Sequence, residues 1–359
     1  MARIIYAVAG EGFGHSSRAH LIGQRLIDAG CDVIFAASQK SFIYLKQYFG
    51  ERVKGGFSLS FAYHNGKVAP LRTIKKTFLD IPDAVRENKA LFENHFKPFE
   101  PDIVLTDFEP FTAWWAFVKK VPFISIDNEH ILTVCKLEHR LKNIYPRFIA
   151  QVVTKSYYFG ADAYIVFSFF EAPLKIEKAV LAPPIVRPIV AELKTSRGDY
   201  ILLYVSTSYG KDKLVKVLSR FPNKQFIIYG FNENAKISNC ILKERSTEGF
   251  LHDLAGCSGV AASAGFSLIS ECIYFKKKML LVPVEGQYEQ IINAQYVEKL
   301  GLGIQAKKLD RKSVERFLGH IDTPMPSDSG IIWPDNEKFF RILQGQFDKL
   351  PQKLDIKIC

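Results

Sequence analysis

The sequence predicts an α/β protein of two domains, each with a parallel sheet covered by helices on both faces. Short apolar segments rich in β-branched residues alternate with longer helical segments, a pattern typical of parallel sheets. With 359 residues the chain is too long for one typical core and suits two domains. A proline-rich connector, residues 182–188, divides the alternating segments into two series.

The first series opens with an apolar strand over residues 3–9. A glycine-rich turn follows, and Ser16 and Ser17 are expected to cap a helix that ends at Gly30. The next expected elements are a strand at 32–37, a helix at 71–96, a strand at 101–107, a helix from Pro110, a strand at 121–126 and a helix at 136–159.

The second series follows the connector with a strand at 200–205 that ends in a turn of small polar residues. Further strands are expected at 225–229, near Ile241, at 259–262 and at 279–284, and helices at 249–255, after residue 265, from residue 289, from Asp310 and at 336–347. The predicted domain organisation is an N-terminal domain at 1–182, a linker at 183–199, a second domain at 200–332, and a last helix and tail at 333–359.

Composition and charge limit the classes of function. The net charge of +11 has no basic tail, which argues against a dedicated nucleic-acid-binding arm. This excess suits anionic substrates or an anionic membrane surface, and an ordinary basic surface explains it as well. The six cysteines form no CxxC pair and no metal-site spacing, which favours a reducing compartment and argues against a metal site. No signal peptide or membrane-spanning segment is expected, so the sequence predicts a cytoplasmic protein.

The glycine-rich turn at residues 10–15 reads GEGFGH and differs from a dinucleotide-binding motif, because His15 stands where that motif needs its third glycine. Glycines let the backbone pass close to a ligand, so Gly12 and Gly14 are interpreted as an acceptor- or phosphate-binding loop that presents His15. Asp107 ends the strand at 101–107, where it is either a site residue or the N-cap of the helix from Pro110.

Polar residues gather after two consecutive strands of the second series. A turn at residues 263–265 precedes a helix that carries Glu271, and a second helix opens with Glu289 and Gln290 and holds Asn293. Ligands bind beyond the carboxyl ends of parallel strands, against helix N-termini that attract anions. This stretch therefore predicts a site for a nucleotide diphosphate sugar.

These motifs, in this order, resemble those of GT-B glycosyltransferases, most of all the family that includes the N-acetylglucosaminyltransferase of lipid II synthesis and the plant galactolipid synthases. The resemblance covers both domains in outline and is specific in the second. It implies two Rossmann-like domains that face one another across a cleft, with the C-terminal helix crossing back to the first domain. It also implies an inverting, metal-independent transfer from a UDP-sugar, which is a substrate and leaves no bound cofactor.

The resemblance assigns the donor contacts residue by residue. Glu271 is expected to accept hydrogen bonds from the ribose hydroxyls, and Glu289 and Gln290 to bind the donor sugar. The family's lipid enzymes often carry a Gln-Gln pair at these last two positions, so the sugar stays open. The other donor-binding residues are Ala264, Gly265 and Phe266 with their N–H groups on the diphosphate, Ser206, Thr207 and Ser208 near the phosphates, Phe250 near the base, and Asn293.

The resemblance also assigns the catalytic groups. In related plant-type enzymes a histidine after the first strand is the general base, and an aspartate at the end of a later strand orients it; His15 and Asp107 match. An inverting transfer needs such a base for the acceptor hydroxyl, and imidazole titrates near neutral pH. The alternative is that His15 binds an acceptor phosphate, with Asp107, Asp127 or Glu129 as the base.

The predicted partners are a nucleotide sugar and a lipid-linked or cell-envelope acceptor, and no nucleic acid. Aromatic and basic residues of the expected helix at 136–159, such as Tyr145, Phe148, Arg147 and Lys155, indicate either a peripheral contact with the inner membrane surface or helix core. The basic run at residues 276–278 is interpreted as a solvated loop. Two other functions remain: a nucleotide-sugar epimerase of the same fold, and a non-enzymatic nucleotide-sugar-binding protein.

Overall fold

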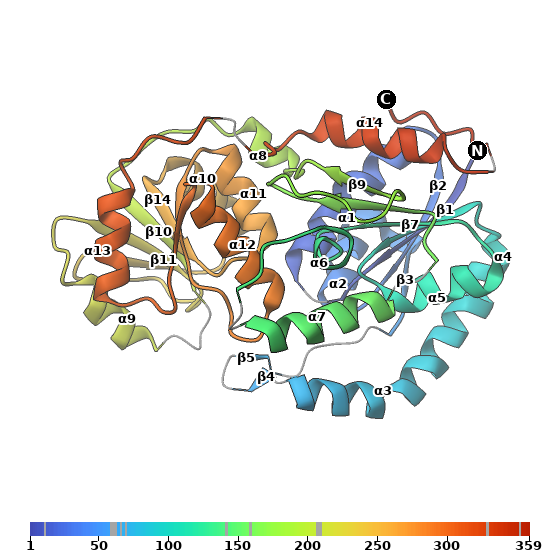
Figure 1. Cartoon of the computed structure of the whole chain (residues 1–359), viewed down its shortest axis with the longest axis horizontal. Helices are drawn as coiled ribbons and strands as arrows, with labels where there is room; N and C mark the ends of the chain where they lie inside the picture. Colours follow the sequence, from blue (N-terminus) through green and yellow to red (C-terminus); the bar gives the residue numbers. More distant parts are fainter. Residues whose placement is uncertain are drawn as a thin grey trace. The chain divides into compact units, whose positions relative to one another are not determined.

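A computed structural model describes residues 1–10, 12–57, 63–64, 67–68, 70–140, 143–157, 160–205, 210–327, 330–351 and 353–359 (Figure 1). The chain forms two compact units. Unit 1 comprises residues 1–62, 69–187 and 335–359, and unit 2 comprises residues 63–68 and 188–334. Each unit is built around a largely parallel sheet, as the sequence predicts, and each of these sheets has seven strands.

The sheet of unit 1 has the strand order β3-β2-β1-β6-β7-β8-β9, and all neighbouring strands are parallel. Its strands are β1 (Arg3–Val8), β2 (Asp32–Ala37), β3 (Val53–Gly55), β6 (Ile103–Asp107), β7 (Phe123–Asp127), β8 (Ala163–Phe167) and β9 (Ala179–Ala182). Its helices are α1 (Phe13–Asp28), α2 (Gln39–Phe49), α3 (Pro70–Leu91), α4 (Lys97–Phe99), α5 (Pro110–Lys119), α6 (Ile131–Val134), α7 (Ile144–Tyr157) and α14 (Asn336–Phe347), with a 3-10 turn at Gly50–Arg52 and a π-helical turn at Phe92–Phe96.

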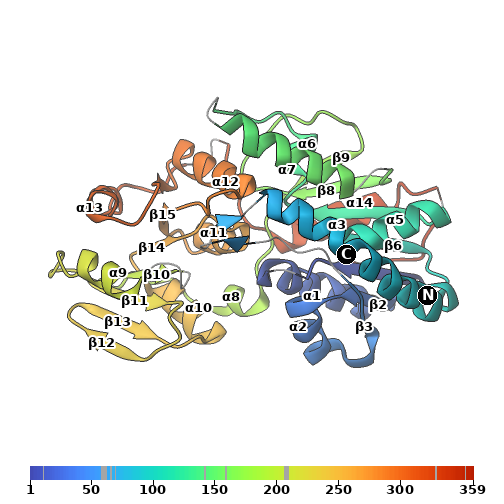
Figure 2. The same ribbon diagram turned by 90° about the horizontal axis from the view of Figure 1, so that it is seen from below.

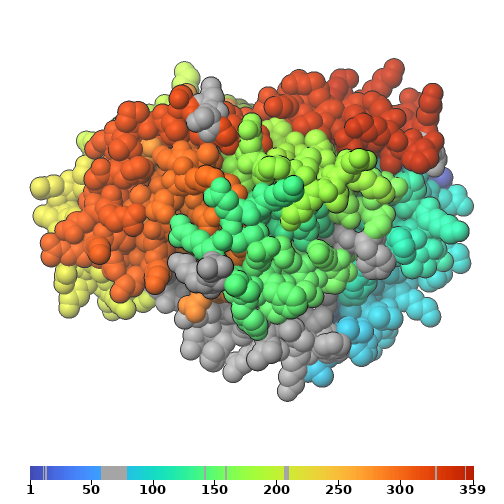
Figure 3. Space-filling model, viewed as in Figure 1, coloured from blue at the N-terminus to red at the C-terminus, as the bar shows by residue number. Residues whose placement is uncertain are grey.

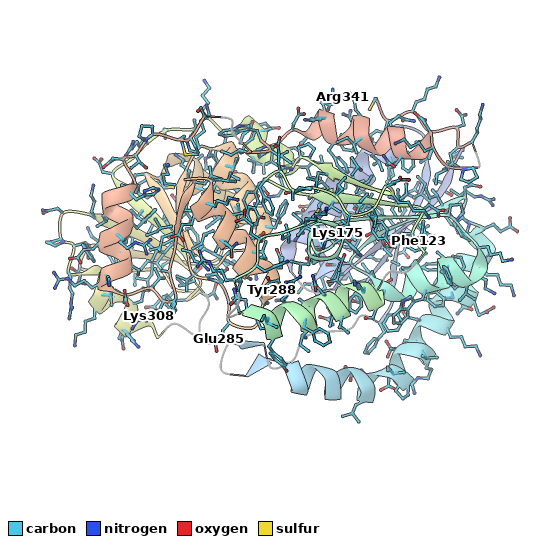
Figure 4. All side chains as sticks on the ribbon, in the orientation of Figure 1. Phe123, Lys175, Glu285, Tyr288, Lys308 and Arg341 are labelled. Carbon is cyan, nitrogen blue, oxygen red and sulfur yellow. The ribbon has the colours of Figure 1, made fainter. Side chains whose placement is uncertain are left out.

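The chain winds outward from β1 in one direction and from β6 in the other. Right-handed crossovers then place α1 and α2 on one face of the sheet and α5 and α7 on the opposite face (Figure 2). The interior strands are buried on both sides, as their continuous apolar sequences require. Phe123, labelled in Figure 4, is one of the fully covered residues of β7.

The sheet of unit 2 has the order β12-β13-β11-β10-β14-β15-β16, in which β12 is antiparallel and the other strands are parallel. Its strands are β10 (Tyr200–Tyr204), β11 (Gln225–Tyr229), β12 (Ala235–Ile237), β13 (Cys240–Lys243), β14 (Gly259–Ala262), β15 (Lys278–Leu281) and β16 (Gly303–Gln305), and a separate antiparallel pair is formed by β4 (Tyr63–His64) and β5 (Lys67–Val68). Its helices are α8 (Pro188–Glu192), α9 (Lys211–Leu218), α10 (Thr247–Gly256), α11 (Phe266–Tyr274), α12 (Tyr288–Lys299) and α13 (Arg311–His320). Helices α9 and α13 cover one face and α10, α11 and α12 the other (Figure 1).

The C-terminal helix α14 returns to the first domain, as predicted. It packs against β8 and β9, where the rings of Phe339 and Phe167 stack with centroids 4.9 Å apart. Arg25 of α1 lies 4.6 Å from the centroid of the Phe340 ring and forms an ion pair with Glu337. The helix therefore completes the core of unit 1.

Two local predictions in unit 1 are wrong. Helix α1 begins at Phe13 and its N-cap is Gly12, so Ser16 and Ser17 lie inside the helix and do not cap it. Gly12 has φ 87°, a backbone conformation that favours glycine and explains the choice of residue. Helix α7 begins only at Ile144, and residues 136–140 are not helical.

The basic run at residues 276–278 is not a solvated loop, because two of its lysines are buried. Lys277 Nζ donates to the carbonyl oxygens of Cys257 (2.8 Å) and Ser196. Lys278 Nζ donates to those of Gly301 (2.6 Å) and Pro324 (2.9 Å). Both ammonium groups thus replace water with carbonyl acceptors, as buried charges require, and join the ends of loops around β14 and β15.

Candidate active site

In unit 1 the order of the strands creates a topological switch point between β1 and β6, where the chain departs in opposite directions. Ligands of open α/β sheets bind at such points, beyond the carboxyl ends of the strands. The register pairs Val8, the last residue of β1, with Asp107, the last residue of β6. His15 lies in the first turn of α1, the helix that follows β1, so both predicted catalytic residues reach the same edge.

His15 and Asp107 form a hydrogen-bonded pair. His15 Nδ1 lies 2.7 Å from Asp107 Oδ1. The Asp107 side chain has no exposed surface, whereas that of His15 is 16% exposed. With Nδ1–H donated to the carboxylate, the neutral ring keeps its lone pair on Nε2, the nitrogen a general base would use. The histidine–aspartate pair assigned by the resemblance is therefore assembled.

Arg18 is a third member of this cluster. Its Nε donates to Asp107 Oδ2 (2.8 Å) and its Nη2 to Asp107 Oδ1 (2.7 Å), a bidentate pair. Its Nη1 donates to Asn128 Oδ1 (3.0 Å), and the guanidinium carbon lies 5.0 Å from the centroid of the Phe167 ring. These contacts fix the orientation of the Asp107 carboxylate, and the buried guanidinium compensates its charge.

Glu129 approaches the other side of the imidazole. Its Oε1 lies 3.6 Å from His15 Nε2, and its side chain is 14% exposed. Glu129 follows β7, which is the neighbour of β6 in the sheet. The segments at the ends of β1, β6 and β7 therefore bring His15, Asp107 and Glu129 together. Asp127, the last residue of β7, is engaged elsewhere, because its carboxylate contacts His130 Nδ1 (2.7 Å) and accepts from Ser125 Oγ (2.7 Å).

The surroundings raise the pKa of His15 from 6.5 to about 8. Burial, the largest influence, lowers this pKa, and Arg18 lowers it further. The carboxylates of Asp107 and Glu129 outweigh both, because they stabilise the imidazolium. In the free protein His15 is therefore largely protonated at neutral pH.

Asp107 is not the N-cap of the next helix, the other role that the sequence allows for it. The N-cap of α5 is Glu109, whose carboxylate accepts hydrogen bonds from the N–H groups of Phe111 (3.0 Å) and Thr112 (2.8 Å). Pro110 takes the first helical position, where its missing N–H costs nothing. The Asp107 carboxylate therefore interacts with His15 and Arg18 instead.

The sequence analysis missed the roles of Arg18 and Asn128 and named Glu129 only as an alternative base. Arg18 is three residues after His15, a spacing that places two side chains on one face of a helix, so it could have been found. Asn128 and Glu129 follow directly after a strand next to β6, but sequence alone does not order the strands.

Unit 2 has its own switch point between β10 and β14. The turn after β14 leads into α11, a nine-residue helix whose N-cap is Gly265. No side chain caps this helix, and a Cβ added to Gly265 would meet no atom within 4 Å. The N-terminus of α11, which includes the N–H of Phe266, therefore adjoins open space, the arrangement that suits an anion.

Gln290 and Asn293 of α12 hold this turn in place. Gln290 Oε1 accepts hydrogen bonds from the N–H groups of Ala264 (3.2 Å) and Val284 (3.0 Å). Asn293 Nδ2 donates to the Ala264 carbonyl (3.0 Å) and to Glu289 Oε1 (2.8 Å). These hydrogen bonds join the loops that follow β14 and β15, and both amide side chains are buried. Gln290, assigned to the donor sugar from the sequence, thus has a structural role in this turn that the sequence did not suggest.

The remaining donor residues fall in three places. Glu271 lies in α11, and its side chain is buried. Phe250 of α10 packs edge-on against Tyr204 and Tyr229, the last residues of β10 and β11, with ring centroids 5.4 and 5.3 Å away. The predicted phosphate contacts, Ser206, Thr207 and Ser208, lie outside the described residues.

The described residues bear on two further features, metal binding and membrane-spanning helices. Within the part of the chain that the structure describes, no three His, Cys, Asp or Glu side chains are arranged to hold a metal ion. Among the same residues, no helix combines the length and apolar character needed to cross a membrane.

Comparisons with known proteins agree with these features. The sequence model of the family described as Glycosyl transferase family 1 matches residues 2–322. A protein of Methanosarcina acetivorans, described as an uncharacterized glycosyltransferase, is 25% identical over 339 residues, which cover 84% of each chain.

Solved structures with a similar fold include three glycosyltransferases. Arabidopsis thaliana UGT89C1 complexed with UDP has a TM-score of 0.63 at 13% identity, and the match covers 96% of this chain and 100% of that one. Phytolacca americana UGT2, complexed with UDP-2fluoro-glucose and pterostilbene, has a TM-score of 0.64 at 10% identity, with the same coverage. The glycotransferase of kitacinnamycin has a TM-score of 0.62 at 14% identity, covering 90% of this chain and 91% of that one. The two parallel sheets therefore form the GT-B fold.

Proposed function

Because this chain belongs to glycosyl transferase family 1, we propose that it transfers a sugar from a UDP-sugar to a hydroxyl group of a lipid-linked or cell-envelope acceptor, with inversion and without a metal ion. The glycosyltransferase activity itself follows from the family. The donor, the acceptor and the mechanism are proposed from the two switch points. The switch point of unit 1 carries His15 as the base, and that of unit 2 carries the N-terminus of α11 as a site for an anion.

In this proposal His15 activates the acceptor. Its Nε2 takes the proton of the acceptor hydroxyl while the oxygen attacks the anomeric carbon, and the bond from that carbon to the diphosphate breaks. Asp107 keeps Nδ1 protonated and stabilises the imidazolium that forms. Arg18 holds Asp107 in the required orientation. Attack opposite to the leaving diphosphate gives inversion.

The donor is assigned to unit 2. The diphosphate lies at the N-terminus of α11, where the N–H groups of Gly265 and Phe266 stabilise the charge that grows on the leaving UDP. These dipoles do the work that a metal ion does in other transferases. The N–H of Ala264, the third group that the sequence assigned to the diphosphate, donates to Gln290 instead. Glu271 accepts from the ribose hydroxyls, and the nucleotide base lies at α10 near Phe250. UDP is proposed as the nucleotide because two of the similar structures are complexes with UDP or a UDP-sugar.

The observation that carries this proposal is the hydrogen-bonded pair of His15 and Asp107 at the switch point of unit 1, with the His15 side chain partly exposed. The experiment is a thermal-shift screen of the whole protein with UDP-sugars, GDP-sugars and dTDP-sugars, since a ligand stabilises the folded state by mass action. The best ligand is then incubated with the protein and EDTA. Slow release of UDP supports a transferase, whereas binding without release supports a sensor. Conversion of the sugar to its epimer without UDP release would support an epimerase.

A further inference from the structure

Helix α7 of unit 1 exposes its apolar side chains to solvent. Ile144 is 59% exposed, Tyr145 58%, Phe148 62% and Val152 49%. These positions recur every three to four residues, so they form a single stripe along the helix. Thr154 is the one fully buried residue of this helix, so most of its apolar side chains are at least partly exposed. A contiguous exposed apolar surface marks an interaction site.

Basic residues border this stripe. Helix α7 contains Arg147 and Lys155 and no acidic residue. Burial lowers the pKa of Lys175 (labelled in Figure 4), and the like charges of Arg147, Lys155 and Lys136 nearby lower it further. Lys175 is held near α6 by its backbone, since its N–H donates to the Val134 carbonyl (2.8 Å). We call Ile144, Tyr145, Phe148 and Val152, with Lys136, Arg147, Lys155 and Lys175, the α7 patch.

The positive charge and the apolar stripe of the α7 patch together indicate which kind of partner it binds. Four cations packed together repel one another, so an anionic partner that reaches all of them relieves this repulsion. A helix with an apolar stripe, an interfacial tyrosine and bordering lysines or arginines is the form that lies in the headgroup region of a bilayer. At 14 residues the helix is roughly 21 Å long, enough to lie on a bilayer and too short to cross it.

We propose that the α7 patch docks this protein on an anionic lipid bilayer, with Ile144, Phe148 and Val152 inserted among the acyl chains and the basic residues against lipid phosphates. Helix α7 belongs to the green region on the face of unit 1 seen in Figure 3. Docking of this kind holds the protein at a surface where a lipid-linked acceptor is concentrated. It rests on the α7 patch and not on the proposed donor site.

Vesicle sedimentation with the full chain tests the proposal. The protein is mixed with vesicles of phosphatidylcholine alone or of equal parts phosphatidylcholine and phosphatidylglycerol. It should bind the second kind and not the first, and binding should weaken as salt is raised. The double substitution I144S/F148S should weaken binding at least tenfold, since each exposed apolar side chain loses its burial. The double substitution K155E/K175E should weaken it at least 25-fold, at about fivefold for each cation removed.

Matched controls separate the patch from general surface effects. Ile43→Ser changes an isoleucine of α2 that is 63% exposed, and Lys224→Glu reverses an exposed lysine of unit 2; neither should alter vesicle binding. The shift in melting temperature caused by the nucleotide sugar should be unchanged in every variant, which also shows that each variant is folded.

Absence of binding to anionic vesicles would overturn the proposal, and so would equal losses in patch variants and controls. A dimer in size-exclusion chromatography that I144S/F148S converts to a monomer would also overturn it, because the stripe would then belong to a second copy of the chain. If vesicle binding persists while no nucleotide sugar binds, the proposed function has failed and the docking surface stands.

Discussion

Replacing Glu129 by glutamine removes a carboxylate from beside His15 Nε2 and keeps the shape of the side chain. The two groups are 3.6 Å apart and partly exposed, at 14% and 16%. With an effective dielectric constant of roughly 40 to 80 their attraction is about 1 to 2 kcal/mol. A pKa unit corresponds to about 1.4 kcal/mol, so the loss of Glu129 should lower the pKa of His15 by about 1 to 1.5 units.

The predicted effect is a change in the pH profile of kcat/KM. A general base acts only when it is deprotonated, so the activity of the wild type should rise with pH through about 8. In Glu129→Gln this rise should move to between about pH 6.5 and 7, and activity at pH 7 should increase about five- to eightfold. Above pH 9 the two profiles should coincide.

The assay is the initial rate of UDP release at subsaturating donor, measured across this pH range. Glu100→Gln is the control, since this carboxylate is 74% exposed and pairs with Arg3 at the opposite edge of the sheet; its profile should match the wild type. The reasoning fails if the rise in Glu129→Gln does not move. Loss of activity at every pH would make Glu129 itself the base or an acceptor ligand.

Three further predictions concern binding and stability. Glu271→Ala should weaken UDP binding by about 1.5–3 kcal/mol, because a charged hydrogen-bond acceptor is lost, and calorimetry that shows unchanged affinity would contradict the ribose assignment. Gln290→Ala should weaken binding of both UDP and UDP-sugar, because two N–H groups of the loops lose their acceptor, whereas Glu289→Ala should affect the UDP-sugar alone; calorimetry with both ligands decides. His15 has a raised pKa, so it stabilises the fold fully below pH 6.5 and this contribution is lost as pH rises through about 8. The difference in unfolding free energy between wild type and His15→Asn should therefore shrink by about 2 kcal/mol from pH 6 to pH 9 in urea titrations, and a constant difference would argue against an imidazolium in the folded protein.

The elements that could be predicted from the sequence are those whose residues are apolar without interruption. The strands at 32–37, 225–229 and 259–262 and the helix at 336–347 have the predicted bounds, because buried strands and an amphipathic last helix leave clear patterns. The pairing of His15 with Asp107 was predicted through the resemblance to GT-B glycosyltransferases, because the sequence by itself does not show that β1 and β6 are neighbours.

Charged and amide side chains account for the errors. Lys277 and Lys278 looked solvated because lysine is rarely buried, yet each long side chain reaches carbonyl groups that no local pattern reveals. Gln290 looked like a sugar ligand, and the structure shows that it first holds the backbone of two loops. The role of Arg18 was missed because its partner Asp107 is distant in sequence. Contacts of this kind depend on the order of the strands.

The turnover of His15→Asn tests the central claim, that His15 is the base of a UDP-sugar-dependent transferase. Asparagine keeps a hydrogen-bonding side chain and takes no proton at neutral pH. The rate of UDP release at saturating donor should fall on the order of 10²–10⁴-fold, while calorimetry should show unchanged donor affinity, because the donor is assigned to unit 2. If His15→Asn retains most of the wild-type rate, His15 is a ligand of the acceptor and the base lies elsewhere.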